Sequence, residues 1–193
     1  MGIILESCAL INESTRKTLF KLEVSGAVFV SIAAVVLHFL YEWSGKEVWA
    51  SLFSAVNESV WEHLKIFSLP YVIWAFVELC CVRVPFRKFV SAKVLSLYFM
   101  FIIIPAFFYT YSGIFGRNIA FVDILSGFAF TVMTFILSYR MIVNAPCIEK
   151  YFKLSLVLFA LYYVMIAFFT YSPPRLEIFK DPISGNYGVA INA

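Results

Sequence analysis

Both histidines of the chain, His38 and His63, occur near carboxylates. His63 belongs to a polar segment that also contains Glu58, Glu62 and Lys65. Imidazole and carboxylate together form a set of donors that suits zinc and related divalent transition metals. The sequence therefore predicts a site for a divalent metal such as zinc, formed by His38, His63 and Glu58.

A metal bound there would lower the pKa of a coordinated water molecule and generate a nucleophile for hydrolysis. In that hypothesis Glu62 is the catalytic general base and Lys65 stabilises an anionic intermediate. Glu58, Glu62 and Lys65 are spaced at i, i+4 and i+7, which places them along one stripe of a helix. His63 lies about 100° around that helix from Glu62, and a His-Glu-x-x-His motif is absent. Other helices must therefore complete the site.

Further polar residues are predicted to contribute to ligand binding at the same level of the membrane. His38 and Glu42 are four residues apart and so share one face of a helix. Asp123 lies one turn inside a later apolar segment, and Asp181 lies in the C-terminal tail. The predicted ligand-binding residues are Asn57, Glu58, Glu42, Asp123 and Asp181.

Three interpretations of this polar group compete. It binds a metal, as in a membrane hydrolase, or it binds or exchanges a small solute, ion or proton, as in a carrier or sensor. In the third interpretation the charged residues form a solvated helix end and the histidines are structural. Each residue taken singly favours the third, whereas two histidines with at least three acids at one level favour function. The sequence decides neither the ligand, the oligomeric state nor whether the protein is an enzyme.

The composition identifies the environment of these residues. Of 193 residues, 62% are hydrophobic and 14% are charged, and the mean hydropathy is +0.88. A soluble domain of this size could not bury so much apolar surface, so the lipid bilayer is the expected partner. The net charge of +3 gives no support to nucleic-acid binding. Neither a Gly-rich phosphate loop nor a Gly-x-Ser-x-Gly motif is present, which argues against familiar soluble enzyme classes.

Apolar stretches predict an all-α, polytopic bundle with about five spanning helices. Roughly 20 apolar residues cross a bilayer core, and lipid-exposed backbone must be helical. A short interfacial helix is predicted within 47–56, between the first two spans, with Trp49 and Phe53 as anchors. Pro70 and Pro105 are expected to kink the second and third spans. The predicted spans are 22–41, 66–82, 94–111, 119–139 and 154–171.

The distribution of positive charge predicts the orientation. Alternate loops carry ten and five of the Lys and Arg residues, and the richer set belongs in the cytoplasm. The chain is therefore expected in the plasma membrane as one domain, with a cytoplasmic segment 1–21, a bundle 22–172 and an extracytoplasmic tail 173–193. Cys8, Cys80, Cys81 and Cys147 then lie near the reducing side. The histidines lie toward the opposite side.

The segment Asn57-Glu-Ser-Val-Trp-Glu-His-Leu-Lys65, with Pro70 after it, His38 before it and a second motif at 179–188, resembles a known family. Its members are small bacterial integral membrane proteins, common in Firmicutes and functionally uncharacterised. The resemblance covers nearly the whole chain, with Ala55 where the family pattern has Pro. It implies a membrane protein and identifies residues to test, but it implies no reaction.

Overall fold

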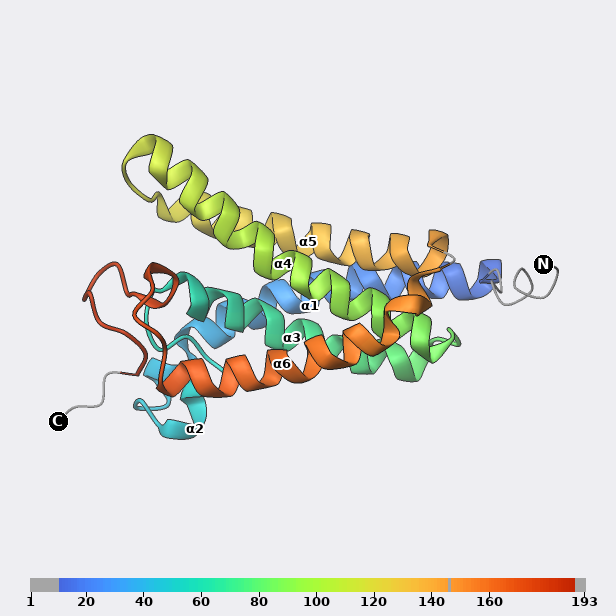
Figure 1. The fold of residues 1–193 in the computed structure, drawn as a ribbon, viewed down its shortest axis with the longest axis horizontal. Coiled ribbons are helices and arrows are strands. Elements are labelled where there is room, and N and C mark those ends of the chain that lie inside the picture. Colours follow the sequence, from blue (N-terminus) through green and yellow to red (C-terminus); the bar gives the residue numbers. More distant parts are fainter. Residues whose placement is uncertain (1–10, 146, 190–193) are drawn as a thin grey trace.

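The computed structural model describes residues 11–145 and 147–189, so Cys8 and residues 1–10 of the predicted segment 1–21 lie outside it. Long helices lie side by side in one bundle (Figure 1). They are α1 Glu13–Trp43, α3 Val60–Cys81, α4 Phe86–Phe115, α5 Ala120–Asn144 and α6 Phe152–Tyr171. Short elements lie between and after them: α2 Val48–Ser51, the 3-10 helix η1 Ile148–Tyr151 and the 3-10 helix η2 Glu177–Phe179.

Within the described residues, five helical segments are long and apolar enough to cross a membrane. Large apolar side chains such as Ile32, Ile102 and Val157 are exposed on their outer faces, as expected for helices that face lipid. The predicted all-α bundle of a multi-pass membrane protein is therefore confirmed. Pro70 and Pro105 both lie inside continuous helices.

The ends of the helices follow from local hydrogen bonding. The Asn12 side chain accepts a hydrogen bond from the backbone N–H of Thr15 at 2.7 Å and caps α1. Ser59 caps α3 by accepting from the N–H of Glu62. Helix α4 ends at Gly116, whose φ of +68° is a conformation that favours glycine. These caps satisfy backbone groups that a helix leaves unpaired.

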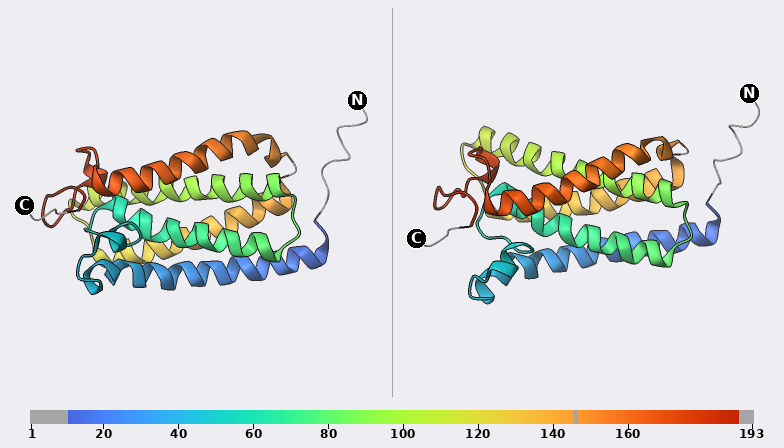
Figure 2. Two further views of the ribbon diagram at one scale, coloured as in Figure 1. Left: turned by 90° about the horizontal axis from the view of Figure 1, so that it is seen from below. Right: turned by 60° about the horizontal axis from the view of Figure 1, so that its bottom comes forward.

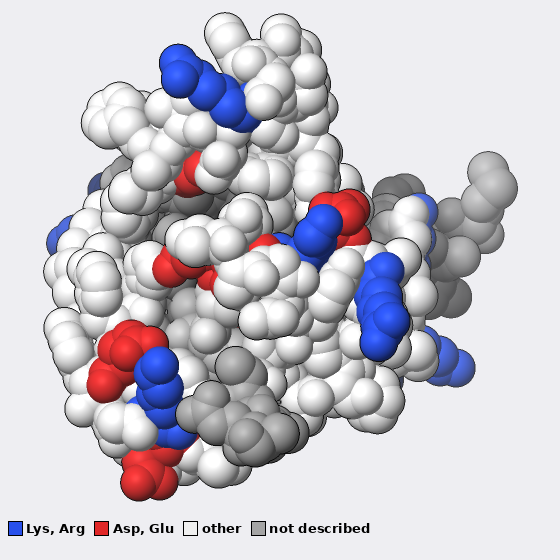
Figure 3. All heavy atoms as spheres, turned by 90° about the vertical axis from the view of Figure 1, so that its left-hand side faces the viewer, with Lys and Arg blue, Asp and Glu red and all other residues white. Residues whose placement is uncertain are grey.

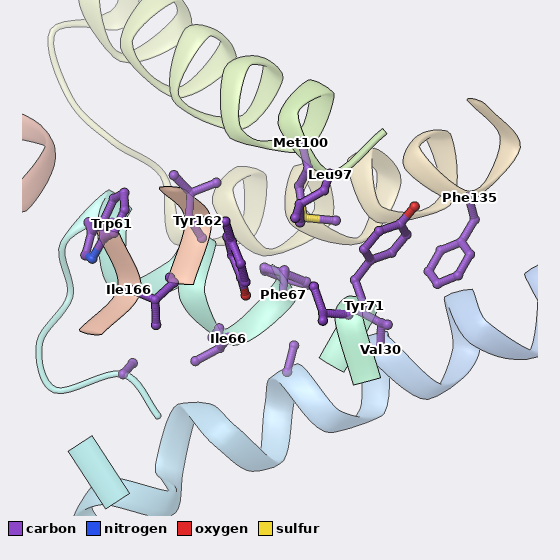
Figure 4. Close-up of a cluster of buried hydrophobic side chains, with 14 of the residues drawn as sticks. Val30, Trp61, Ile66, Phe67, Tyr71, Leu97, Met100, Phe135, Tyr162 and Ile166 are labelled. Atoms are coloured by element: carbon purple, nitrogen blue, oxygen red, sulfur yellow. The ribbon is translucent and has the colours of Figure 1, made fainter. Parts of the chain in front are cut away.

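Packing between the long helices forms a central hydrophobic core. Helix α4 packs against α3, α5 and α6, while α1 packs against α3 and α5. In the core the ring of Tyr71 from α3 meets Phe135 from α5 with ring centroids 4.9 Å apart (Figure 4). A second buried cluster, around Leu19, Phe89 and Ile142, lies nearer the start of α1. The two clusters hold the helices together along their length.

The bundle has two chemically different ends. At one end lie α2, the α4–α5 turn and the C-terminal segment, and we call it the histidine end because His38 and His63 lie near it (Figure 2). The start of α1, the α3–α4 connection and η1 lie at the other end, which we call the N-terminal end. Charged side chains on the histidine end form separate patches with uncharged atoms between them (Figure 3).

Candidate functional site

His38, Glu58 and His63 come together at the histidine end. The Nε2 atoms of His38 and His63 lie 3.9 Å and 3.5 Å from Oε2 of Glu58. One ligand atom from each of the three residues lies within 4.8 Å of the other two. The two imidazole rings are 5.3 Å apart between centroids and steeply inclined at 68°. Their side chains are 31–41% exposed, so solvent reaches the cluster.

Helix geometry orients the ring of His63. Its Nδ1 atom lies 2.9 Å from the backbone carbonyl oxygen of Ser59, one turn earlier. A carbonyl only accepts, so this hydrogen bond requires the proton to be on Nδ1. In the neutral ring Nε2 then carries the lone pair and faces Glu58, which is the arrangement that metal-binding histidines use.

The segment that carries Glu58 is fixed from both sides. Asn57 Oδ1 accepts from the backbone N–H of Ser59 at 2.9 Å. Asn57 Nδ2 donates to the carbonyl oxygen of Gly188 at 3.0 Å. Asn57 was predicted to bind a ligand. In the structure both polar atoms of its amide group form hydrogen bonds that join the start of α3 to the C-terminal tail.

Glu62 and Lys65, the predicted catalytic residues, form a buried ion pair with 2.6 Å between Lys65 Nζ and Glu62 Oε2. Their side chains are 2% and 0% exposed. The same carboxylate oxygen accepts from the backbone N–H of Val56 at 3.1 Å. Lys65 donates to the carbonyl oxygen of Ser51 at 2.7 Å and to Thr170. This pair ties the connection between α2 and α3 to α6.

Asp181 organises the C-terminal tail. Its carboxylate accepts from the backbone N–H groups of Ile183 and Ser184 and from the Ser184 hydroxyl. Burial alone would raise the pKa of Asp181, but these hydrogen bonds outweigh it and the pKa lies below its ordinary value. A cleft of about 290 Å³ runs beside this turn, and Glu58, Tyr109 and Lys180 also line it. Glu58 is thus shared between the histidine cluster and the cleft.

The remaining predicted ligand-binding residues lie elsewhere on the histidine end. Glu42 forms an exposed ion pair with Lys46, at 3.6 Å. Asp123 accepts a hydrogen bond from the Tyr111 hydroxyl, which in turn accepts from the backbone N–H of Ile119. Asp123 therefore stabilises the α4–α5 turn, which projects from the bundle apart from the tail (Figure 1).

A second polar cluster, nearer the N-terminal end, was not predicted from the sequence. Lys93 Nζ lies 2.9 Å from Glu23 Oε2 and also forms an ion pair with Glu78. The Ser138 hydroxyl donates to Glu23 Oε1 at 2.9 Å. None of these residues was predicted as a site residue. Glu23 is nevertheless a charged residue inside the first predicted apolar span, and an ionisable group there indicates a functional site.

The chain matches a known protein family. The model of a family described as a family of unknown function (DUF6512) matches residues 11–189. No curated protein and no solved structure matches the chain. The match confirms the predicted resemblance to an uncharacterised family.

Proposed function

We propose that this chain, which belongs to the family of unknown function DUF6512, is a multi-pass membrane protein that binds a divalent transition metal ion through His38, Glu58 and His63. The observation that carries the proposal is the convergence of three ligand atoms within 4.8 Å. They come from separate parts of the chain: α1, the segment before α3, and α3 itself. Two imidazoles and a carboxylate are the donors of several catalytic zinc sites.

The distances are compatible with a small closure of the side chains around an ion. Donor atoms bound to a tetrahedral zinc at ~2.1 Å lie roughly 3.4 Å from one another. The His63–Glu58 distance of 3.5 Å is already of that size, and the His38–Glu58 distance of 3.9 Å exceeds it by little. Binding an ion would require the Glu58 carboxylate and both imidazole rings to move closer together, because the three ligand atoms lie within 4.8 Å of one another and not yet at the roughly 3.4 Å of a tetrahedral zinc site.

Three protein donors leave the fourth position of a tetrahedral ion to water, so metal-dependent hydrolysis is the second step of the proposal. The cleft that Glu58 shares with the tail offers space for a substrate beside the metal. Glu62 forms an ion pair with Lys65 and accepts a hydrogen bond from the backbone N–H of Val56. We therefore assign Glu62 and Lys65 a structural role, in which they position the backbone around the site. A water molecule on the metal would then be the nucleophile, and Glu58 would act as a metal ligand.

Metal analysis of the detergent-purified protein tests the proposal. We expect near-stoichiometric zinc, or another divalent transition metal, after reconstitution of the wild-type chain. His38→Ala and His63→Ala should each lose it, because two remaining donors hold an ion weakly. Glu42→Gln is the matched control, since it removes an acid from the same helix as His38 without touching the cluster. Retention of metal in both histidine variants, or no metal in the reconstituted wild type, would contradict the proposal.

We infer in addition that the histidine end faces away from the cytoplasm of a bacterial cell. The supporting pattern is the excess of Lys and Arg on the loops of the N-terminal end. In the proposed orientation the chain lies in the plasma membrane with its N-terminus inside, its tail outside and its proposed metal site open to the exterior.

Thiol labelling in intact cells tests this orientation. The exposed Cys147, between α5 and η1, lies at the N-terminal end. A membrane-impermeant maleimide should label it only after the cells are permeabilised. Lys46→Cys, which adds a thiol beside α2 at the histidine end, should be labelled at least several-fold more strongly in intact cells. Labelling of Cys147 in intact cells without labelling at residue 46 would reverse the orientation.

A further inference from the structure

The cluster of Glu23, Glu78 and Lys93 joins three of the long helices inside the bundle. Glu23 belongs to α1, Glu78 to α3 and Lys93 to α4. The exposed fractions of the three residues are 3%, 0% and 4%. Rings of Tyr71, Phe89 and Phe135 lie 5.1–5.7 Å from the Lys93 ammonium group, so its surroundings beyond the two carboxylates are largely apolar.

The formal charges of this cluster do not balance. Two carboxylates and one ammonium carry a net charge of −1 when all three are ionised. A net charge away from water and within the apolar part of a membrane protein is strongly unfavourable, because neither solvent nor lipid stabilises it. One additional positive charge makes the cluster neutral.

The structure contains an independent indication of where that charge belongs. Among the described residues, neither carboxylate oxygen of Glu78 has a hydrogen-bond partner, and both are buried. Glu78 Oε2 is within ion-pair distance of Lys93. The indole N–H of Trp74 lies near the Glu78 carboxyl, but it donates to the carbonyl oxygen of Leu22, so Oε1 is the atom left without a counterpart. Buried polar atoms in native proteins are nearly always satisfied, and an unsatisfied carboxylate oxygen is a site for a proton.

We propose that Glu23 and Glu78 form a proton-binding site within the membrane-spanning bundle, holding one proton between them at neutral pH. Lys93 supplies one positive charge, and the bound proton, taken from water, supplies the other. Ser138, which donates to Glu23 Oε1, satisfies the oxygen of Glu23 that Lys93 does not contact. The site is separate from the histidine cluster and does not depend on a metal.

The side chains that surround the two carboxyl groups and Lys93 are uncharged. From α3, Tyr71 faces the cluster and donates to the backbone carbonyl oxygen of Lys93. From α5, Ser138 and Phe135 face it, and from α4 Phe89 accompanies Lys93. Among the described residues no further Asp, Glu, Lys or Arg forms an ion pair with these three.

Infrared spectroscopy of the full-length protein tests the proposal, because the C=O stretch of a protonated carboxyl group is separate from the carboxylate bands. At pH 7 we expect a signal equal to one carboxylic acid per chain, lost on alkaline titration. Glu23→Gln or Glu78→Gln leaves one carboxylate with one ammonium, which is neutral without a proton. Each single variant should therefore lose the signal at pH 7.

Two further variants make the result specific. Lys93→Met leaves two carboxyls without a cation, and the signal should rise about twofold. Glu42→Gln, which alters an exposed acid, should leave it unchanged. The absence of the signal from wild type at pH 7, or its persistence in both Gln variants, would overturn the proposal. Each Gln variant retains a neutral ion pair between Lys93 and the remaining carboxylate, so it should fold. The two Gln variants therefore test the proposal even if Lys93→Met does not fold.

Discussion

Replacing Lys65 by Met is expected to lower the free energy of unfolding by about 3–5 kcal/mol. The substitution leaves Glu62 buried and without its counter-ion, and it removes the donors to the Ser51 carbonyl oxygen and Thr170. An unpaired buried charge is far more costly than the loss of an exposed pair. Reversible unfolding in mixed detergent micelles, followed by tryptophan fluorescence, measures the change.

The chain provides a matched control in Lys46, which pairs with Glu42 at the surface with both side chains at least 60% exposed. Lys46→Met should cost about 1 kcal/mol or less. The double variant Glu62→Gln with Lys65→Met removes both charges and should recover much of the loss. If Lys65→Met were no more destabilising than Lys46→Met, the pair would not hold the connection in place.

Replacing Gly26 by Ala is expected to destabilise the bundle by about 1–3 kcal/mol. A Cβ added at Gly26 would collide with the rings of Trp74 from α3 and Phe135 from α5. Gly26 is thus the place where α1 approaches both neighbours closely. Trp74 is also held by the hydrogen bond of its Nε1 to the carbonyl oxygen of Leu22, at 2.9 Å, so its ring has little freedom to move aside.

Gly113 is the control for this substitution, since it is also inside a long helix and a Cβ there would meet nothing within 4 Å. Gly113→Ala should be neutral, or stabilising by about 1 kcal/mol, because Ala favours helix over Gly. The same unfolding measurement applies to both variants. Equal effects at the two positions would show that close helix packing at Gly26 is unimportant.

The sequence predicted the five spans well because apolar length is a direct consequence of the bilayer. It underestimated the ends of the helices. The window that began at Leu22 belongs to a helix that begins at Glu13, and the one that began at Val94 belongs to a helix that begins at Phe86. Charged residues lower the hydropathy of a window without breaking a helix, so hydropathy reports the apolar part of a span and not its ends.

The same limitation explains why the Glu23–Lys93–Glu78 cluster escaped prediction. Lys93 fell just outside an apolar window and was counted as a loop charge, so it was not considered as a partner for Glu78. Sequence spacing also cannot show which faces of α1, α3 and α4 meet. The proximity of His38 to His63 was easier to predict. Two residues at the same depth in the membrane lie close together whenever their helices are neighbours.

The hydrogen-bond partners of the polar residues at the histidine end could not be predicted from the sequence. Glu58, Glu62 and Lys65 were expected on one stripe of a helix. The structure shows this for Glu62 and Lys65, but Glu58 lies before α3, which begins at Val60. The burial of Glu62 and Lys65 depends on how the segment after α2 folds over them. The bond between Asn57 and Gly188 joins positions 131 residues apart. No local pattern encodes a contact of that kind.

That contact also sets an order of events during synthesis. The segment containing Glu58 and His63 is made long before Gly188, which supplies the carbonyl oxygen that Asn57 binds. At about 5–20 residues per second, the intervening chain takes roughly 7–26 s to appear. Glu58 and His63 are therefore made several seconds or more before the tail can bind at the start of α3, so the proposed site is completed only after Gly188 has been synthesised.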